Sequence, residues 1–210
     1  QEIEDNDGVD AILQVGLPGG YGFYGVADIL SGAVSPSGHL TDTYAVKNAS
    51  APSAQNFGDL QWANANPDIS MNDAIVEAEN IYIGYKYYET RYFDTVMGQG
   101  NADSAVGSST DGGWSYDNEV TYPFGYGLSY SDFAYEKIES VKQDKKNIRV
   151  TVSVKNTSGR DGEEVVQLYA SYPDSKVERP SKQLRAFKRI PIKAGETREV
   201  TLTVPKEELG

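Results

Sequence analysis

Two tryptophans lie in segments rich in hydrogen-bonding residues, a combination that could bind a sugar. Trp62 and Trp114 both occur in stretches of Gly, Ser, Asn and Asp that show no hydrophobic periodicity. An indole ring offers a flat apolar face for stacking on a sugar ring, while neighbouring polar side chains reach its hydroxyl groups. Either tryptophan could instead anchor its loop to a hydrophobic core. Trp62 and Trp114 are therefore the candidate substrate-binding residues, with a packing role as the open alternative.

The motif GYGFYG at residues 20–25 has the spacing of the dinucleotide-binding fingerprint, with Asp42 about 20 residues further on. We reject a nucleotide site because the bulky Tyr21 and Phe23 stand where a pyrophosphate must approach bare backbone. No apolar strand ends at Asp42, which lies in a tail rich in Pro, Ser and Gly. The motif is predicted to be a structural turn, and no cofactor is expected.

The sequence lacks other motifs that are typical of catalytic or metal-binding sites. His39 is the single histidine and cysteine is absent, so neither an imidazole cluster nor a thiolate site can form. No G-x-S-x-G motif supplies a nucleophile. The motif DNDG at residues 5–8 starts like a calcium loop, but no Glu follows at the required distance, which predicts a turn. Glu77, Glu79 and Glu89 are predicted to be solvated, and we expect no metal.

The charge distribution indicates two parts of the chain and limits the classes of partner that it could bind. Residues 1–130 contain three Lys or Arg against 18 Asp or Glu, whereas residues 131–210 contain 16 against 13, which predicts two domains. The net charge of −12 and a pI near 4.5 disfavour nucleic acid and anionic membranes as partners. The apolar run at residues 9–17 is too short to span a bilayer, so a soluble segment is expected. Absence of cysteine fits a cytoplasmic or an extracellular location.

The N-terminal part is predicted to be the end of an α/β domain, over residues 1–47. Residues 8–16 are a short apolar run between glycines, which is typical of a strand buried on both faces. Residues 25–32 have apolar side chains at helical spacing and end at a glycine. One strand and one helix cannot bury their own faces, so we expect the rest of this domain before Gln1.

Residues 48–130 show no sustained hydrophobic period and are predicted to be a linker with loops. Within them, residues 81–88 are rich in Tyr and Ile and are predicted to be strand-like. Residues 98–113 are polar and glycine-rich, and we expect a mobile loop there unless a neighbour orders it.

Residues 131–210 have the pattern of an antiparallel β-sandwich, because apolar side chains recur at every second position. Five strands are expected, near residues 135–141, 148–154, 163–171, 184–190 and 197–204. An immunoglobulin-like sandwich has about seven strands, so we predict that this one is incomplete and that the chain is truncated at both ends.

Several motifs, in order along the chain, resemble segments of glycoside hydrolase family 3. Residues 17–40, from LPGG to SGHL, resemble the end of the second domain of that family. IYIGYKYY at residues 81–88 resembles its Gly-Tyr-Arg-Tyr-Tyr segment, and PFGYGLSY at residues 123–130 is similar to its junction motif. EEVVQLY at residues 163–169 and RPSKQLRAF at residues 179–187 resemble its fibronectin type III-like domain.

This resemblance implies a fold class, a reaction and partners. The fold is the end of an α/β sandwich domain, an aromatic and glycine-rich linker, and a fibronectin type III-like β-sandwich. The implied reaction is that of a retaining exo-acting β-glucosidase or β-xylosidase, which uses two carboxylates about 5–5.5 Å apart. In the family both carboxylates lie upstream, so no catalytic residue is assigned to this chain. The implied partners are the N-terminal catalytic barrel of the same protein and, through the intact parent, a carbohydrate.

The sequence departs from the family pattern at several places, which leaves the substrate preference open. HLT occupies residues 39–41, where the family usually has Arg-Leu-Pro. Lys86 replaces the usual arginine, and EN at residues 79–80 replaces a common Glu-Gly. The segment of residues 97–119 is longer than the matching segment in many members of the family. The alternative from another class is a non-catalytic binding or structural β-sandwich module, which the same residues support.

Overall fold

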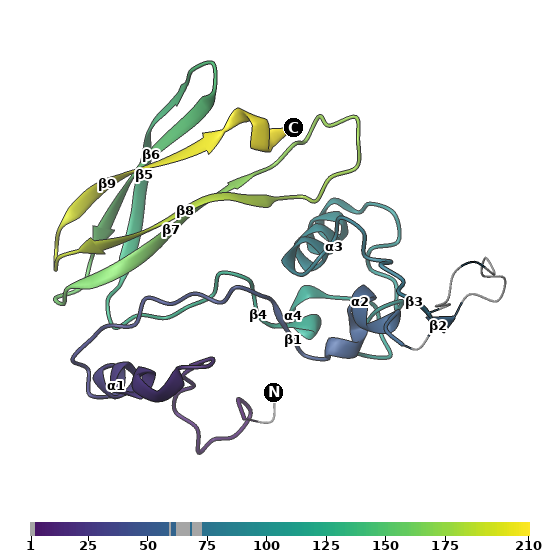
Figure 1. Ribbon diagram of the computed structural model, residues 1–210, viewed down its shortest axis with the longest axis horizontal. Coiled ribbons are helices and arrows are strands. Elements are labelled where there is room, and N and C mark those ends of the chain that lie inside the picture. The colour runs from purple at the N-terminus through teal and green to yellow at the C-terminus, as the bar shows by residue number, and fades with distance from the viewer. Residues whose placement is uncertain (1–2, 59, 62–67, 69–72) are drawn as a thin grey trace. The chain divides into compact units, whose positions relative to one another are not determined.

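The computed structural model describes residues 3–58, 60–61, 68 and 73–210, whose elements are labelled in Figure 1. The chain forms two compact units. Unit 1 comprises Gln1–Leu40, Tyr126–Ala170 and Leu184–Gly210, and unit 2 comprises Thr41–Gly125 and Ser171–Gln183. Each unit is therefore assembled from segments that are far apart in the sequence. No helix of the described residues is long and apolar enough to cross a lipid bilayer.

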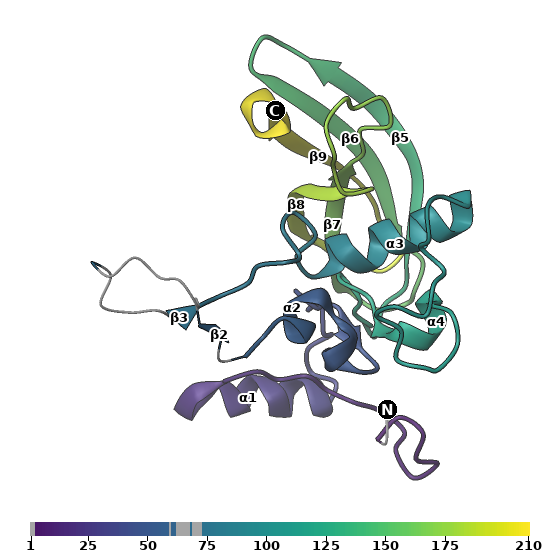
Figure 2. The ribbon, with the colours of Figure 1, turned by 90° about the vertical axis from the view of Figure 1, so that its right-hand side faces the viewer.

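Unit 1 contains the β-sandwich that the alternating pattern predicts. Its strands are β5 (Phe133–Gln143), β6 (Asn147–Asn156), β7 (Gly162–Ala170), β8 (Gln183–Ile192) and β9 (Thr197–Pro205), followed by the short 3₁₀ helix η2 (Lys206–Leu209). β5, β6 and β9 form one antiparallel sheet in that order, and β7 pairs with β8 (Figures 1 and 2). All five predicted strands are confirmed.

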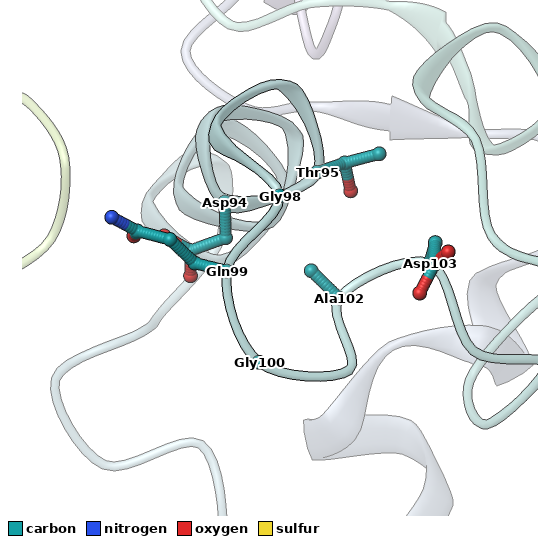
Figure 3. Close-up of a pocket in the computed structure, with 7 residues that line it drawn as sticks. All are labelled: Asp94, Thr95, Gly98, Gln99, Gly100, Ala102 and Asp103. Atoms are coloured by element: carbon teal, nitrogen blue, oxygen red, sulfur yellow. The ribbon is translucent and has the colours of Figure 1, made fainter.

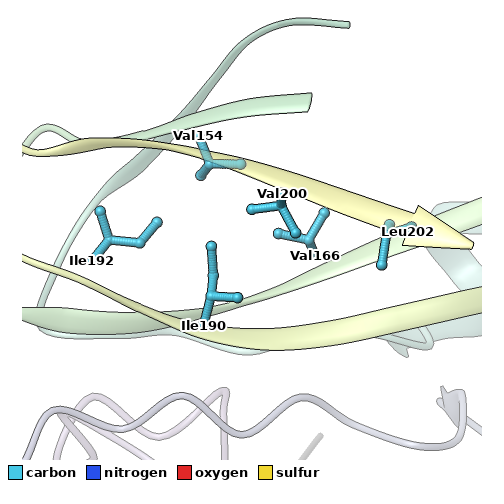
Figure 4. Close-up of a cluster of buried hydrophobic side chains, with 6 residues drawn as sticks. All are labelled: Val154, Val166, Ile190, Ile192, Val200 and Leu202. Carbon is cyan, nitrogen blue, oxygen red and sulfur yellow. The ribbon is translucent and has the colours of Figure 1, made fainter. Parts of the chain in front are cut away.

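The core of the sandwich lies between these two sheets. Strand pairing brings side chains of one face together, and Val152 of β6 lies opposite Val200 of β9. Figure 4 shows six buried side chains that meet in this core: Val154, Val166, Ile190, Ile192, Val200 and Leu202. Burying one such aliphatic side chain contributes about 1.5–3 kcal/mol to the stability of the fold. Burial of these side chains therefore holds the two sheets together.

The segment before the first helix is not the predicted strand. Residues 8–16 are irregular, and Val9 and Ile12 are 37% and 51% exposed. A strand buried on both faces requires flanking strands and covering helices, and no described residue pairs with this segment as a strand. The predicted strand is therefore not present among the described residues.

Helix α1 (Gly19–Leu30) confirms the helix predicted over residues 25–32 and begins earlier. It contains the whole motif at residues 20–25, so the prediction of a turn there is wrong. The tight conformations that require glycine lie at the two ends of the helix, where Gly19 and Gly32 have φ angles of 63° and 77°.

The motif at residues 123–130 brings its backbone against the segment that follows α1. The Leu40 N–H donates to the carbonyl oxygen of Tyr126 at 2.8 Å. Gly127 lies at the closest approach, where a Cβ would overlap the carbonyl oxygen of Gly38. A residue without a side chain is required here because the two backbones leave no room for one.

Unit 2 consists of short elements around one longer helix. They are β1 (Tyr44–Ala45), η1 (Asn48–Ser50), α2 (Pro52–Gln55), β2 (Leu60–Gln61), β3 (Asp73–Ala74), α3 (Tyr85–Met97), α4 (Tyr116–Glu119) and β4 (Val120–Tyr122). β1 pairs with β4 and β2 with β3, both antiparallel.

Helix α3 includes the second half of the segment predicted to be strand-like, residues 81–88, and its first half is irregular, so that prediction is wrong. Gly84 and Gly98 flank the helix with φ angles of 57° and 65°, which favour glycine. Helical spacing also brings Arg91 to Tyr87, and the guanidinium donates to the phenol oxygen at 2.7 Å. Abundant Tyr and Ile favour strands only on average, and here contacts four residues apart favour the helix.

Replacing Gly127 with alanine is expected to lower the free energy of unfolding by about 1–3 kcal/mol, because the added methyl group forces two backbones apart. Thermal and urea unfolding of the chain would measure the loss. Gly159→Ala is the matched control, since no atom lies within 4 Å of the Cβ it would add. Equal stability of the two variants would contradict the close-approach argument.

Candidate functional site

A cluster of aromatic side chains forms the core of unit 2 and contains Trp114. Tyr88, Trp114 and Val120 are buried, and Trp114 is only 2% exposed. The ring of Tyr116 packs edge-on against that of Trp114, with 6.5 Å between the centroids. Burial raises the pKa of Tyr88 to about 12, so its phenol is neutral near pH 7. The structure therefore gives Trp114 a packing role, and its predicted contact with a sugar stays a prediction.

Arg91 on α3 ties the following loop to this cluster. Its guanidinium lies over the Trp114 ring, 4.9 Å from the centroid. Nε and Nη2 donate to the carbonyl oxygens of Ala102 and Ser104 at 2.7 and 2.9 Å, and Nη1 donates to the phenol of Tyr87. Charge-assisted hydrogen bonds and a cation–π contact thus hold the first part of a loop that has no regular structure.

Glu119 holds the later part of the same loop. Its carboxylate is fully buried and accepts from the Ser108 hydroxyl at 3.0 Å and from the N–H and hydroxyl of Ser109 at 2.6 and 2.5 Å. No salt bridge joins Glu119 to a Lys or Arg in the described part of the chain. Hydrogen bonds alone compensate its burial. Arg91 and Glu119 are therefore the neighbours that order residues 98–113.

The indole N–H of Trp114 is buried without a hydrogen-bond partner among the described residues. Its backbone N–H, in contrast, reaches the carbonyl oxygens of Asp103 and Ser104 at 3.1 and 3.2 Å. A buried donor without an acceptor costs about 1–3 kcal/mol. A water molecule or a ligand hydroxyl would remove this cost, so the indole N–H is the group of the cluster to which an external acceptor could bind.

Glu89 joins three segments of unit 2. Its Oε1 accepts from the Tyr116 phenol at 2.5 Å, and its Oε2 lies 2.7 Å from Lys182 Nζ. Burial of Tyr116, together with the hydrogen bond to Glu89, raises the pKa of that phenol. The Glu89 side chain is 13% exposed, so the prediction that it is solvated is wrong.

A small depression lies at the C-terminal end of α3 (Figure 3). Its volume is about 120 Å³, and it is lined by Asp94, Thr95, Gly98, Gln99, Gly100, Ala102 and Asp103. Burial raises the pKa of Asp94. Within the described ranges, no group of three or more His, Asp or Glu side chains could hold a metal ion. Ligand pockets usually measure roughly 300–1,000 Å³, so we do not place a substrate here.

The remaining sequence candidates contribute little to this site. Trp62 lies outside the described residues, so its contact with a sugar stays a prediction. His39 Nδ1 lies 3.0 Å from the carbonyl oxygen of Ser37, a local backbone contact. Glu77 is exposed, as predicted, whereas Glu79 is half-buried and its Oε2 has no hydrogen-bond partner among the described residues.

Sequence reasoning did not find Arg91 or Glu119. The available signal for Arg91 was its position four residues after Tyr87, which is informative only when the segment is read as a helix. Glu119 accepts hydrogen bonds from serines about ten residues earlier, across an irregular loop. No periodic pattern indicates such a contact.

The sequence profile of the glycosyl hydrolase family 3 C-terminal domain matches residues 1–130, and that of the fibronectin type III-like domain matches residues 164–210. The first match spans more than half of the chain. The chain therefore belongs to glycoside hydrolase family 3, and an α/β segment followed by a β-sandwich is confirmed as its fold class. The domain boundaries at residues 47 and 130 stay predictions.

Several proteins that are similar to this chain are β-glucosidases. Thermostable β-glucosidase B of Acetivibrio thermocellus is 33% identical over 204 residues, which cover 95% of this chain and 22% of the relative. β-Glucosidase BoGH3A of Bacteroides ovatus is 31% identical, over 96% of this chain and 23% of the relative. The crystal structure of a β-glucosidase from Paenibacillus barengoltzii matches 90% of this chain and 17% of its own, with 32% identity and a TM-score of 0.67. The chain thus spans less than a quarter of these proteins.

Replacing Glu119 with glutamine is expected to lower the free energy of unfolding by about 1–3 kcal/mol. The amide keeps one acceptor oxygen and turns a buried N–H group toward the serine donors, Ser108 and Ser109. Urea unfolding would measure the loss, with Asp117→Asn as the control because Asp117 lies on the same short helix but is exposed. If the two variants were equally stable, Glu119 would not be holding the loop.

Proposed function

We propose that this chain is the C-terminal segment of a retaining, exo-acting glycoside hydrolase that releases terminal β-linked glucose or xylose from oligosaccharides or glycosides. Membership of family 3, with relatives named β-glucosidases along nearly the whole chain, is the observation that carries the proposal. Carbohydrate binds to the intact parent, and the N-terminal catalytic barrel of the same protein is the partner of this segment.

Within that enzyme, the segment supports the active site and does not supply its chemistry. A retaining mechanism needs two carboxylates that both reach the anomeric centre, about 5–5.5 Å apart. Two poorly exposed carboxylates of unit 2 are already engaged, Glu119 by serine donors and Glu89 by Tyr116 and Lys182. Their contacts support a structural role, so the reacting pair belongs to the rest of the parent.

The purified 210-residue chain is expected to show no hydrolysis of aryl β-glucosides or β-xylosides, whereas the parent protein hydrolyses them. The reason is that both catalytic carboxylates lie outside this chain. Release of the aryl leaving group, followed by absorbance, would measure both proteins. Turnover by the isolated chain would place the active site within it, and an inactive parent would favour the non-catalytic module.

We propose Trp114 as a contact for a leaving-group sugar. Its indole N–H, which has no hydrogen-bond partner among the described residues, would donate to a sugar hydroxyl. Trp114→Phe in the parent keeps an aromatic ring and removes this donor. We expect KM for oligosaccharides to rise about fivefold or more, which corresponds to about 1 kcal/mol for one lost hydrogen bond. KM for aryl glycosides, which offer less sugar, should change little.

The packing role of Trp114 predicts a different result. In that case Trp114→Phe lowers the melting temperature of the parent and affects both substrate types alike. Unchanged oligosaccharide kinetics in a stably folded variant would end the sugar-contact proposal, while the glycosidase proposal would stand on the activity of the parent.

A further inference from the structure

The connection between β7 and β8 belongs to a different unit from most of the sandwich that it joins. Residues Ser171–Gln183 are part of unit 2, whereas β7 and nearly all of β8 are part of unit 1. This connection lies inside the match to the fibronectin type III-like domain. We call it the arm. A loop of the sandwich is thus built into the unit that contains α3 and Trp114.

Polar contacts fix the arm on α3 and on the residues just before it. Lys182 pairs with Glu89, and the backbone N–H of Ser181 donates to the Thr90 hydroxyl at 2.9 Å. The Tyr82 phenol donates to Glu178 at 2.7 Å. Pro180, next to these contacts, is buried. The arm is therefore attached to unit 2 at several points along its second half.

The pair between Lys182 and Glu89 leads from the arm to Trp114. Glu89 accepts the hydrogen bond of the Tyr116 phenol with its other oxygen, and the ring of Tyr116 packs edge-on against Trp114. Arg91, one half-turn along the same helix, covers the Trp114 ring with its guanidinium. A series of contacts therefore connects Lys182 of the arm, through Glu89 and Tyr116, to the indole of Trp114.

The pair is more than a contact between solvated ions. The Lys182 side chain is 43% exposed, but that of Glu89 is only 13% exposed. Fully exposed ion pairs contribute little, whereas removing one member of a desolvated pair leaves the other charge without compensation. Without Lys182, the free energy falls when the Glu89 carboxylate moves toward water. This movement draws the hydrogen-bonded Tyr116 away from the Trp114 ring that it supports.

We propose that the arm positions Trp114: through Lys182, Glu89 and Tyr116, the arm holds the indole in its buried place beneath the guanidinium of Arg91. The partner of this surface of α3 is the β7–β8 connection of the same chain. The arm thereby acts on the aromatic cluster, whatever reaction the parent performs.

The test uses Trp114 as its own reporter. In the 210-residue chain carrying Trp62→Phe, all tryptophan fluorescence comes from Trp114. Adding Lys182→Met should raise the acrylamide quenching constant at least about threefold and shift the emission to longer wavelength, because the indole becomes accessible to solvent. Glu89→Gln should act in the same direction, and Lys182→Arg should preserve the original quenching. Lys176→Met is the matched control, since Lys176 is an exposed lysine of the same arm.

Hydrogen exchange separates positioning from general loosening of the fold. The amides of α3 should lose protection in the Lys182→Met chain, while those of β6 and β9 keep theirs. Unchanged quenching in both Lys182→Met and Glu89→Gln would overturn the proposal. Equal loss of protection in β6 and β9 would overturn it as well, because the lysine would then stabilise the whole chain and not the cluster.

Discussion

The loop of residues 98–113 depends on two charges of opposite sign, each satisfied by the loop itself. Arg91 donates to carbonyl groups of its first part, and Glu119 accepts from serines of its later part. Few of its side chains are apolar, so burial alone cannot offset the entropy lost when it becomes ordered. Charge-assisted hydrogen bonds supply the stabilisation instead. Removing either charge would leave its half-buried partners without these hydrogen bonds, which is why the loop, Trp114 and α3 must be considered together.

The sandwich of unit 1 is held by a different force. Its core consists of aliphatic side chains from facing sheets, whose burial is non-directional and tolerates small shifts. Hydrogen bonds of unit 2 are directional, and each requires a particular partner at a particular place. The contrast agrees with the composition, since the acidic, polar part of the chain falls largely in unit 2. A single substitution should therefore have more local and more specific effects in unit 2 than in the sandwich core.

This difference also decides what the sequence could predict. The five strands were predictable because alternation is a local pattern and one core satisfies all of them. Residues 81–88 were misread because aromatic richness favours strands, while the glycines at positions 84 and 98 and the spacing of Tyr87 and Arg91 define a helix. Residues 8–16 have the composition of a buried strand but no strand partner among the described residues. Composition indicated Trp114 as a candidate, whose contact with a sugar stays a prediction, whereas Arg91, Glu89 and Glu119 act through tertiary contacts that no periodic pattern indicates.

The same contacts give a physical reason, independent of family resemblance, not to assign the catalytic pair of the proposed glycosidase to Glu119 or Glu89. A general acid or a carboxylate nucleophile must reach the substrate and exchange protons there. Glu119 has no exposed surface and accepts from Ser108 and Ser109, and Glu89 is occupied by Tyr116 and Lys182. Releasing either carboxylate for chemistry would undo the packing around Trp114. The polar groups of this cluster are thus committed to placing the aromatic ring of Trp114, whose contact with a sugar stays a prediction.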